Sequence, residues 1–347
     1  MRDKSLVIHV GPLSSKGGMS GVMKLLINNP PKKYETKFLD TYISSSTINK
    51  VINLIKLRKK IKQDIKILNP DVFHFHVTHN YSWWRNLLLI KIAIKKKIPS
   101  IIHIHSGKFD IFCMKYNKLS GRILHKLSLN SLIKIVVLEE RWLISLGKFS
   151  NNMSCIRNPV ELEKTSTLDI EPKKGISLLL IARGDKIKGH NFAVEVMEYI
   201  SQKGYDARLD MTGISKKTEK MKDLQIDTHG WLDNHEDIRK LIRDSDFLLS
   251  PSEFEGSSMS ILESMALGTI PIVSKVSSET VSIKELVVEN RDPKEWGERI
   301  IKILSESKEE ELRRKVNEVI QKHEVSLISS QWEGIYEIII NKKIKQQ

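Results

Sequence analysis

Two carboxylates stand close together in a glycine- and serine-rich stretch at residues 250–268. Glu255 precedes a short segment with helical spacing, and Glu263 lies inside that segment, with seven residues between them. The runs 247–250 and 269–273 on either side are apolar enough to form buried strands. The pattern predicts a strand, a loop, a short helix and a strand. In an open α/β sheet such a loop lies at the carboxyl edge, where ligands bind.

The start of this predicted helix would aim backbone N–H groups outward and form an anion site. Ser257 or Ser258 would be the N-cap, and the amides following Gly256, including that of Met259, could hold a phosphate. Glu263 would lean back toward the same ligand, because helical side chains tilt toward the N-terminus. A carboxylate beside phosphate suits the hydroxyls of a ribose or sugar. The stretch therefore indicates a sugar-nucleotide site, although for either glutamate alone an ordinary solvated side chain is the simpler interpretation.

Two cations follow the first strand of the second half. The run 176–182 is apolar throughout, which is typical of a strand buried on both faces, and Arg183 and Lys188 come directly after it. Carboxyl ends of parallel strands share one edge, so both side chains could reach the crevice beside the 250–268 loop. Together they could bind a diphosphate without a metal. The alternative is that both are surface charges, and spacing alone does not decide.

The first half begins in the same way, with an apolar run at 6–10, the glycines Gly17 and Gly18, and a helical pattern. Further on, histidines alternate along two predicted strands, at His74 and His76 and then at His103 and His105, with His79 between the strands. Alternation places each pair on one sheet face. A metal site is one interpretation, but hydrogen-bonded core or cleft histidines are more common where no carboxylate ligand pattern accompanies them. His105, at the end of its strand, is the best placed to meet a ligand.

The segment 251–273 resembles the signature of family-four retaining glycosyltransferases of the GT-B fold (glycosyl transferases group 1). The matching residues read Pro-Ser-x-x-Glu-Gly, then Leu-Glu-Ser-Met-Ala-x-Gly, then Pro-Ile-Val. The resemblance implies an α/β fold with two Rossmann-like doubly wound domains facing a central cleft. Residues 1–160 would bind the acceptor and 161–325 the nucleotide sugar, with a polar linker at 161–175 and a helix in 326–347 returning to the first domain. One departure is visible, since residues 274–279 replace the glycine-rich loop with which the family contacts the sugar.

The resemblance also implies a role for each matching residue. Glu255 would orient the sugar hydroxyls and stabilise positive charge, Glu263 would hold the ribose, and His105 would hydrogen-bond the donor sugar. The predicted catalytic residues are Glu255, His105, Arg183 and Lys188. The predicted donor-binding residues are Gly17, Gly18, Arg183, Lys188, Gly213, Gly256, Ser257, Ser258, Met259 and Glu263. The leaving phosphate would take the acceptor proton, the anomeric configuration would be retained, and no metal or other cofactor is expected.

Positive charge is concentrated in the first half of the chain. Residues 1–170 hold 29 Lys and Arg against 11 Asp and Glu, whereas the remainder holds 28 against 31. This asymmetry predicts an anionic partner surface, with solubility as the simpler explanation. A basic amphipathic helix predicted at 48–68 could dock on a membrane surface, and a plain core-packed helix fits its pattern equally well. Trp83 and Trp84 could serve as an interfacial anchor or acceptor contact, although tryptophan more often packs in a core.

The overall composition limits the classes of protein to which the chain could belong. With 347 residues, 40% hydrophobic and 29% charged, the chain fits a soluble globular protein of two domains. No apolar run could span a bilayer and the start lacks a signal peptide, so we expect a cytoplasmic protein, with peripheral attachment at the inner face of the cell membrane as an extension. Two cysteines are too few for a disulfide framework.

These features predict a hexosyltransferase. The donor would be a nucleotide sugar, with a UDP-sugar favoured over GDP-mannose, and the acceptor a growing, lipid-linked saccharide in surface polysaccharide or glycolipid biosynthesis. One alternative is transfer to a soluble sugar or a phosphate. A different class of alternative is a non-catalytic basic protein on a membrane surface or nucleic acid. An aromatic content of 6% and the lack of an RNA-binding motif argue against a nucleic-acid partner.

Overall fold

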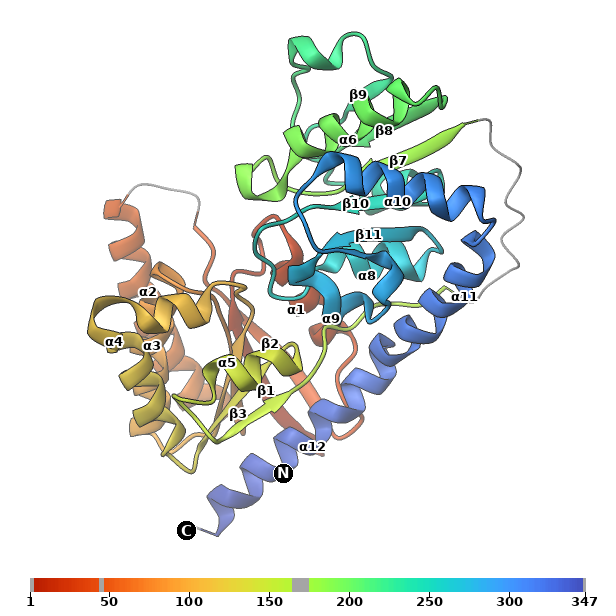
Figure 1. Cartoon of the computed structure of the whole chain (residues 1–347). Helices are drawn as coiled ribbons and strands as arrows, with labels where there is room; N and C mark the ends of the chain where they lie inside the picture. Colours follow the sequence, from red (N-terminus) through yellow and green to blue (C-terminus); the bar gives the residue numbers. More distant parts are fainter. Residues whose placement is uncertain (1–2, 44–46, 164–174, 346–347) are drawn as a thin grey trace. The chain divides into compact units, whose positions relative to one another are not determined.

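The computed structural model describes residues 3–43, 47–163 and 175–345 (Figure 1). The chain divides into two compact units, one made of Met1–Pro159 with Val325–Gln347 and the other of Val160–Glu324. Each unit is built around its own parallel six-stranded sheet flanked by helices. The predicted α/β class with two doubly wound units is confirmed. The linker predicted at 161–175 lies mostly outside the described residues.

The sheet of the first unit has the strand order β2-β1-β3-β4-β5-β6, and all neighbouring strands are parallel. Its strands are β1 (Ser5–Gly11), β2 (Tyr34–Asp40), β3 (Val72–Val77), β4 (Ser100–Ile104), β5 (Ile133–Val137) and β6 (Met153–Cys155). Its helices are α1 (Gly18–Asn28), α2 (Thr47–Leu68), α3 (Tyr81–Lys95), α4 (Phe109–Ser128), α5 (Glu140–Leu146) and α12 (Val325–Ile344). Strands β3 and β4 are buried along their whole length, which explains why both are apolar apart from the histidines and one serine.

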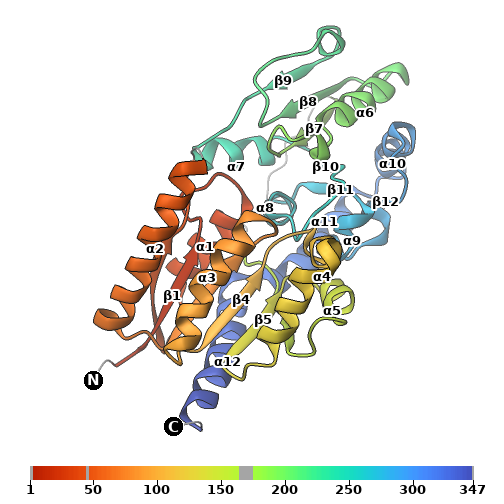
Figure 2. The same ribbon diagram turned by 90° about the vertical axis from the view of Figure 1, so that its left-hand side faces the viewer.

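Helices cover both faces of this first sheet. Helices α2, α3 and α4 lie side by side on the face that Figure 2 presents to the viewer. Helix α12 lies against the opposite face, where Ser329 Oγ donates to the Asn29 carbonyl at 2.9 Å and the Trp332 ring packs on His74 with centroids 4.4 Å apart. The last helix of the chain therefore completes the core of the first unit, although the whole second unit intervenes in the sequence.

The second unit repeats the architecture with the strand order β12-β11-β10-β7-β8-β9, again parallel. Its strands are β7 (Ile176–Leu180), β8 (Ala207–Met211), β9 (Ile226–Thr228), β10 (Phe247–Ser250), β11 (Ile270–Ser274) and β12 (Val287–Val288). Its α-helices are α6 (His190–Gln202), α7 (His235–Arg243), α8 (Met259–Ala266), α9 (Ser278–Val281), α10 (Pro293–Ser305) and α11 (Glu309–Ile320). Short 3₁₀ turns occur at η1 (Lys186–Lys188), η2 (Glu219–Met221), η3 (Lys275–Ser277), η4 (Lys284–Leu286) and η5 (Gln321–His323).

Local capping sets several helix starts. Asn234 is the N-cap of α7, where its side chain accepts a hydrogen bond from the Glu236 amide. Asp292 caps α10 in the same way and Pro293 occupies the first helical position. Strand β10 spans residues 247–250 as predicted. None of the helices in the described part of the chain combines the length and hydrophobicity that crossing a bilayer requires.

Candidate functional site

Two loops of the second unit meet at the carboxyl edge of its sheet. Strands β7 and β10 are direct neighbours, so the segments that follow them must leave the sheet side by side. The amide of Glu253 donates to the Ile187 carbonyl at 3.0 Å, which joins the loop after β10 to the turn η1 after β7. Gly189 has φ +83°, and a Cβ there would lie 2.8 Å from the Pro251 ring. Only glycine permits both this backbone conformation and this close approach.

This junction brings together two residues that the sequence predicts as catalytic. The Lys188 Nζ lies 2.5 Å from Glu255 Oε1, and both side chains are largely buried, with 18% and 12% of their surfaces exposed. Lys188 comes from the segment after β7 and Glu255 from the loop after β10, and the two residues are 67 positions apart in sequence. The pair holds an ammonium and a carboxylate at one fixed point on the sheet edge, which is the kind of preorganised charge that stabilises a charged transition state.

Arg183, the other predicted cation, is placed differently. It follows β7 on the same edge, but its side chain is 59% exposed and pairs with Asp185 at 3.2 Å. An exposed ion pair of this kind contributes little to stability and gives way readily to a stronger anion. Arg183 therefore lies at the predicted edge of the sheet, but it forms a surface ion pair with Asp185 and is not part of the Lys188–Glu255 pair.

Helix α8 begins four residues after Glu255, at Met259. Ser258 occupies the N-cap, as one of the two predicted alternatives, but its hydroxyl lies 3.0 Å from the Ser260 hydroxyl and does not cap a helix amide. Gly256 and Met259 are buried, and Ser257 is half-buried. A helix start without a side-chain cap keeps its first amides directed at the sheet edge, which suits an anion.

Glu263 lies one turn into α8 and is partly buried. Burial raises the pKa of its carboxyl to about 7, against a smaller opposing effect from the Arg239 guanidinium. With a pKa of about 7, the carboxyl is present in both its neutral and its ionised form near neutral pH, and hydrogen bonds from hydroxyl donors favour the ionised form. This is compatible with the predicted contact to a ribose.

Gly213, predicted as a donor-binding residue, also lies at this edge. Its φ is +83°, and a Cβ there would come within 2.0 Å of the Ala182 carbonyl oxygen. The neighbouring Thr212 carbonyl accepts a hydrogen bond from His190 Nε2 at 2.9 Å in a buried contact. Close packing between the ends of β7 and β8 is therefore enough to require glycine at 213, whether or not a ligand contacts it.

The remaining predicted residues belong to the first unit, at the carboxyl edge of its own sheet. Gly17 precedes α1 with φ +125°, and Gly18 is the first residue of that helix. His105 follows β4, is partly buried, and its Nε2 lies 2.9 Å from His76 Nδ1. Burial lowers the pKa of the His105 ring to about 3, so the ring is neutral at pH 7.

The predicted histidine pairs do share one sheet face, and the face holds one ring more than the sequence pattern indicates. His9, on β1, contacts His76 with Nδ1 and Nε2 3.0 Å apart. His74 contacts His103 at 3.0 Å and the Tyr336 hydroxyl at 2.9 Å. The signal for His9 was present in β1, where it faces the same way as Val7, but only the cross-strand register reveals its partner. No carboxylate belongs to the clusters of possible metal ligands found among the described residues, which consist of histidines alone.

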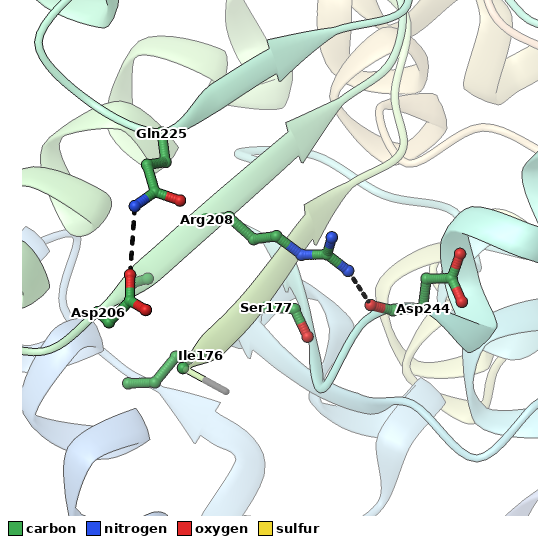
Figure 3. Close-up of a pocket in the computed structure, with 8 residues that line it drawn as sticks. Ile176, Ser177, Asp206, Arg208, Gln225 and Asp244 are labelled. Carbon is green, nitrogen blue, oxygen red and sulfur yellow. Dashed lines mark hydrogen bonds between the residues drawn. The ribbon is translucent and has the colours of Figure 1, made fainter. Parts of the chain in front are cut away.

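A hollow in the second unit lies at the opposite, amino edge of the sheet. It has a volume of about 440 Å³, and Figure 3 shows Arg208 donating to the Asp244 carbonyl and Gln225 donating to Asp206 at its rim. These residues precede or begin the strands β7 and β8 or lie in loops at the same edge. In open α/β sheets ligands bind at the carboxyl edge, so this hollow is separate from the candidate site.

Comparison with known proteins agrees with the fold. Residues 169–323 match the family model "Glycosyl transferases group 1". The chain has a TM-score of 0.73 with a sucrose-phosphate synthase from Thermosynechococcus elongatus, at 15% identity over 96% of this chain and 98% of the other. The GT-B fold is thereby shown, and fold and family model together support a GT-B glycosyltransferase.

Two further similarities are more specific in their descriptions. An uncharacterized 41.2 kDa protein in the cps region of Klebsiella pneumoniae is 24% identical over 295 residues, which cover 78% of this chain and 81% of the relative. The lipopolysaccharide outer core galactosyltransferase WaaB in its apo form has a TM-score of 0.66 at 15% identity, over 95% of this chain and 98% of that one.

Proposed function

We propose that this protein is a retaining, metal-independent glycosyltransferase of family four that moves a hexose from a UDP-sugar or GDP-mannose to a lipid-linked saccharide in surface polysaccharide or glycolipid assembly. The observation that carries the proposal is the buried Lys188–Glu255 pair beside the start of α8. A diphosphate leaving group needs fixed positive charge, and an oxocarbenium-like sugar needs a nearby carboxylate. The junction of the β7 and β10 loops offers both within one ion pair.

In the proposed reaction the donor diphosphate displaces Glu255 from Lys188 and is also held by Arg183 and the first amides of α8. Glu255 is then available to the sugar hydroxyls and to the positive charge that develops at the anomeric carbon. Glu263 accepts hydrogen bonds from the ribose. The bond from the anomeric carbon to the diphosphate oxygen breaks, the acceptor hydroxyl attacks on the same face, and its proton passes to the departing phosphate. These steps require no metal ion, and the protein supplies charge and position.

The acceptor class is proposed from the first unit. Exposed apolar side chains occur at the N-terminal halves of three helices that lie on one sheet face: Ile48, Val51, Ile52 and Ile55 on α2, Tyr81, Trp84 and Leu88 on α3, and Ile111, Met114 and Leu119 on α4. The Trp84 ring meets Phe112 edge-on at 6.4 Å, which links the second and third groups. We call these residues the apolar rim. All three helices begin where strands end, so the rim lies at the carboxyl edge, as does His105.

The composition of α2 favours docking over plain packing, the alternative that its sequence left open. Leu57 and Ile61 are buried, whereas Val51, Ile52 and Ile55 are exposed by 45% to 57%. Exposed cations follow on the same helix at Lys56, Arg58, Lys59, Lys60, Lys62 and Lys66. Apolar side chains next to lysines are the pattern of helices that lie in the interface of an anionic bilayer. We propose attachment to the inner face of the cell membrane, and the cps region relative supports surface polysaccharide as the product.

Calorimetric titration with UDP and then GDP, each with and without EDTA, tests the donor site. We expect one nucleotide to bind, with an affinity that EDTA leaves unchanged and that Arg183→Ala or Lys188→Ala lowers by about tenfold to a hundredfold, the usual value of a charged hydrogen bond to phosphate. Lys186→Ala is the matched control, because Lys186 is an exposed lysine two residues from Lys188. If neither nucleotide binds the folded protein, the proposed function is wrong.

A further inference from the structure

Five histidine rings of the first unit form two hydrogen-bonded rows across the sheet. The first, which we call the His105 row, runs from His9 through His76 to His105, with nitrogen to nitrogen distances of 3.0 Å and 2.9 Å. The second, the Tyr336 row, runs from His103 through His74 to the Tyr336 hydroxyl, with distances of 3.0 Å and 2.9 Å. No hydrogen bond joins the two rows in the contacts found among these five rings.

The strand register explains the direction of the rows. His9 is paired with His74 across β1 and β3, and His76 with His103 across β3 and β4. Each hydrogen bond therefore joins a ring to the ring two residues further along on the next strand, and the His105 row climbs diagonally to the carboxyl edge. The His74 and His76 rings stack at 4.4 Å with an interplanar angle of 8°, so the two rows lie against each other without sharing a hydrogen bond in the described part of the chain.

The rings of the His105 row are neutral at pH 7, because burial lowers the pKa of each. A neutral imidazole carries one N–H and one bare nitrogen. Each contact of about 3 Å needs one hydrogen between its two nitrogens, since two hydrogens would clash and two lone pairs would repel. Because both contacts join an Nδ1 to an Nε2, the three rings must all carry hydrogen on Nδ1 or all carry it on Nε2.

We propose that His9 and His76 are positioning residues that fix the tautomer of His105, so that its Nδ1, the nitrogen that takes no part in the row, has one defined hydrogen-bonding character. If all three rings carry hydrogen on Nδ1, His105 offers a donor at the sheet edge, and if all carry it on Nε2, His105 offers an acceptor. A sugar hydroxyl at this edge would contact the His105 ring, which cannot change its tautomer unless His9 and His76 change theirs as well. The consequence for donor binding rests on the proposed function, whereas the shared tautomer is a property of the folded chain itself.

A metal ion is the competing use of these rings. His76, His103 and His105 bring one nitrogen each to within 4.8 Å of one another, as do His9, His74 and His76. In the described residues, however, most of these nitrogens face one another in hydrogen bonds, so a metal could bind only by breaking the rows. Metal binding and a fixed tautomer therefore exclude each other, and one experiment can separate them.

Nitrogen-15 NMR of the histidine rings, on full-length protein labelled at histidine, reads the tautomer directly. We expect the rings of His9, His76 and His105 to show one and the same tautomer at pH 7, unchanged by one equivalent of Zn²⁺. Different tautomers within the row, exchange averaging at His105, or a joint shift of His76, His103 and His105 with Zn²⁺ would each overturn the proposal. This result needs no enzymatic activity, so it stands even if the protein binds no nucleotide.

Variants of His9 test whether the row acts at a distance. His9→Leu removes the distant end of the row, so we expect mixed tautomers at His105 and a rise in KM for the sugar nucleotide of about fivefold with little change in kcat, the effect of weakening one hydrogen bond. His9→Asn keeps an amide near the Nδ1 position and should restore both readouts. His74→Leu is the matched control, because His74 is equally buried on the same face but belongs to the Tyr336 row.

Equal effects of His9→Leu and His74→Leu on KM, or no rescue by His9→Asn when that variant melts at the wild-type temperature, would show that His9 only fills space. If His9→Leu does not fold, the tautomer of His105 in the wild type and in His9→Asn still decides the proposal.

Discussion

The two units have the same scaffold but carry opposite chemistry at the carboxyl edges of their sheets. Each is a parallel six-stranded sheet wrapped by helices. The first unit places neutral imidazoles and apolar side chains at this edge, whereas the second places a buried ion pair and a helix start. The sheet fixes where ligand groups stand, and the residues at the strand ends decide whether they offer neutral hydrogen bonds or charge.

The difference extends to the interior. On the described part of the first unit, His9, His74, His76 and His103 are buried within one sheet face, and burial lowers the pKa of all four. In the second unit, burial raises the pKa of the partly buried Glu263 to about 7, whereas burial lowers the pKa of His190. The first unit therefore resists gaining protons at five histidines, whereas the second unit combines one group of each kind, so the first unit should be the more sensitive to acid.

The largest expected effect is unfolding of the first unit in mild acid. Each histidine of the two rows has a folded pKa below the ordinary value of 6.5, so the unfolded chain binds more protons as the pH falls below 6.5. Each ring then costs the folded state up to about 1.4 kcal/mol per pH unit. Hydrogen exchange followed by mass spectrometry between pH 7 and 5 should show loss of protection in β1, β3 and β4 before β7 and β10. Simultaneous loss in both sheets would remove this distinction between the units.

The next largest effect concerns the ion pair of the second unit. Glu255→Ala or Lys188→Ala should lower kcat by a factor on the order of 10² to 10³, because each removes a preorganised charge from the transition state. Release of nucleoside diphosphate from the donor, with Lys186→Ala as the control, measures this. Thermal melting of each variant separates loss of catalysis from loss of fold, because the remaining buried charge also loses its partner. Full turnover by both single variants would exclude the pair from the chemistry.

Membrane attachment should depend on the first unit alone. Replacing Val51, Ile52 and Ile55 with serine should weaken binding to vesicles that contain phosphatidylglycerol by about 10-fold to 100-fold, since each exposed side chain loses roughly 1 kcal/mol of apolar burial. Tyr205→Ser, at an exposed aromatic residue of the second unit, is the control. Vesicle sedimentation at low and high salt measures both contributions, and equal losses in the two variants would argue against a docking role for the apolar rim.

The smallest effect is the pH dependence of donor affinity. The pKa of Glu263 is raised to about 7, so its carboxylate form is in the minority at pH 6 and in the majority at pH 8. Ribose hydroxyls donate to the carboxylate, and affinity for the intact sugar nucleotide should rise by at most about tenfold over this range. The sugar nucleotide is preferred to the free diphosphate as the ligand, because the latter has a phosphate that titrates in the same range. Glu263→Gln should bind with no such slope, and a slope that persists in the variant would assign it to another group.

The sequence predicts the second unit's site more fully than the first's. Residues 247–250 and the segment around Glu255 and Glu263 are read correctly from local pattern, because strand, loop and helix follow one another in the chain. The sequence also predicts that Lys188 lies at the same sheet edge as the loop of Glu255, but the ion pair between the two side chains is seen only in the structure. The exposure of Arg183 in a surface pair does not follow, since nothing local fixes where a long flexible side chain points.

In the first unit the important contacts are between strands and are hidden from local pattern. Alternation correctly places His103 with His105 on one face, but the row that includes His9 depends on the order β1-β3-β4 and its register. The partner of His74 is more remote still, because Tyr336 comes from α12. Helix α2 was predicted as amphipathic, yet the division between buried Ile61 and exposed Val51, Ile52 and Ile55 depends on where the sheet ends beneath it.

The position of α12 in the sequence has a consequence for biosynthesis. A ribosome finishes the six strands of the first sheet long before it makes the helix that covers one of their faces. At 5–20 residues per second, the intervening second unit and the helix take roughly ten to forty seconds to appear. During that interval, the histidine face of the first sheet lacks its contacts with Trp332 and Tyr336, whereas the second unit, residues 160–324, is completed before α12. The second unit should therefore reach its native state first, and the first unit should complete its core only after α12 has been synthesised.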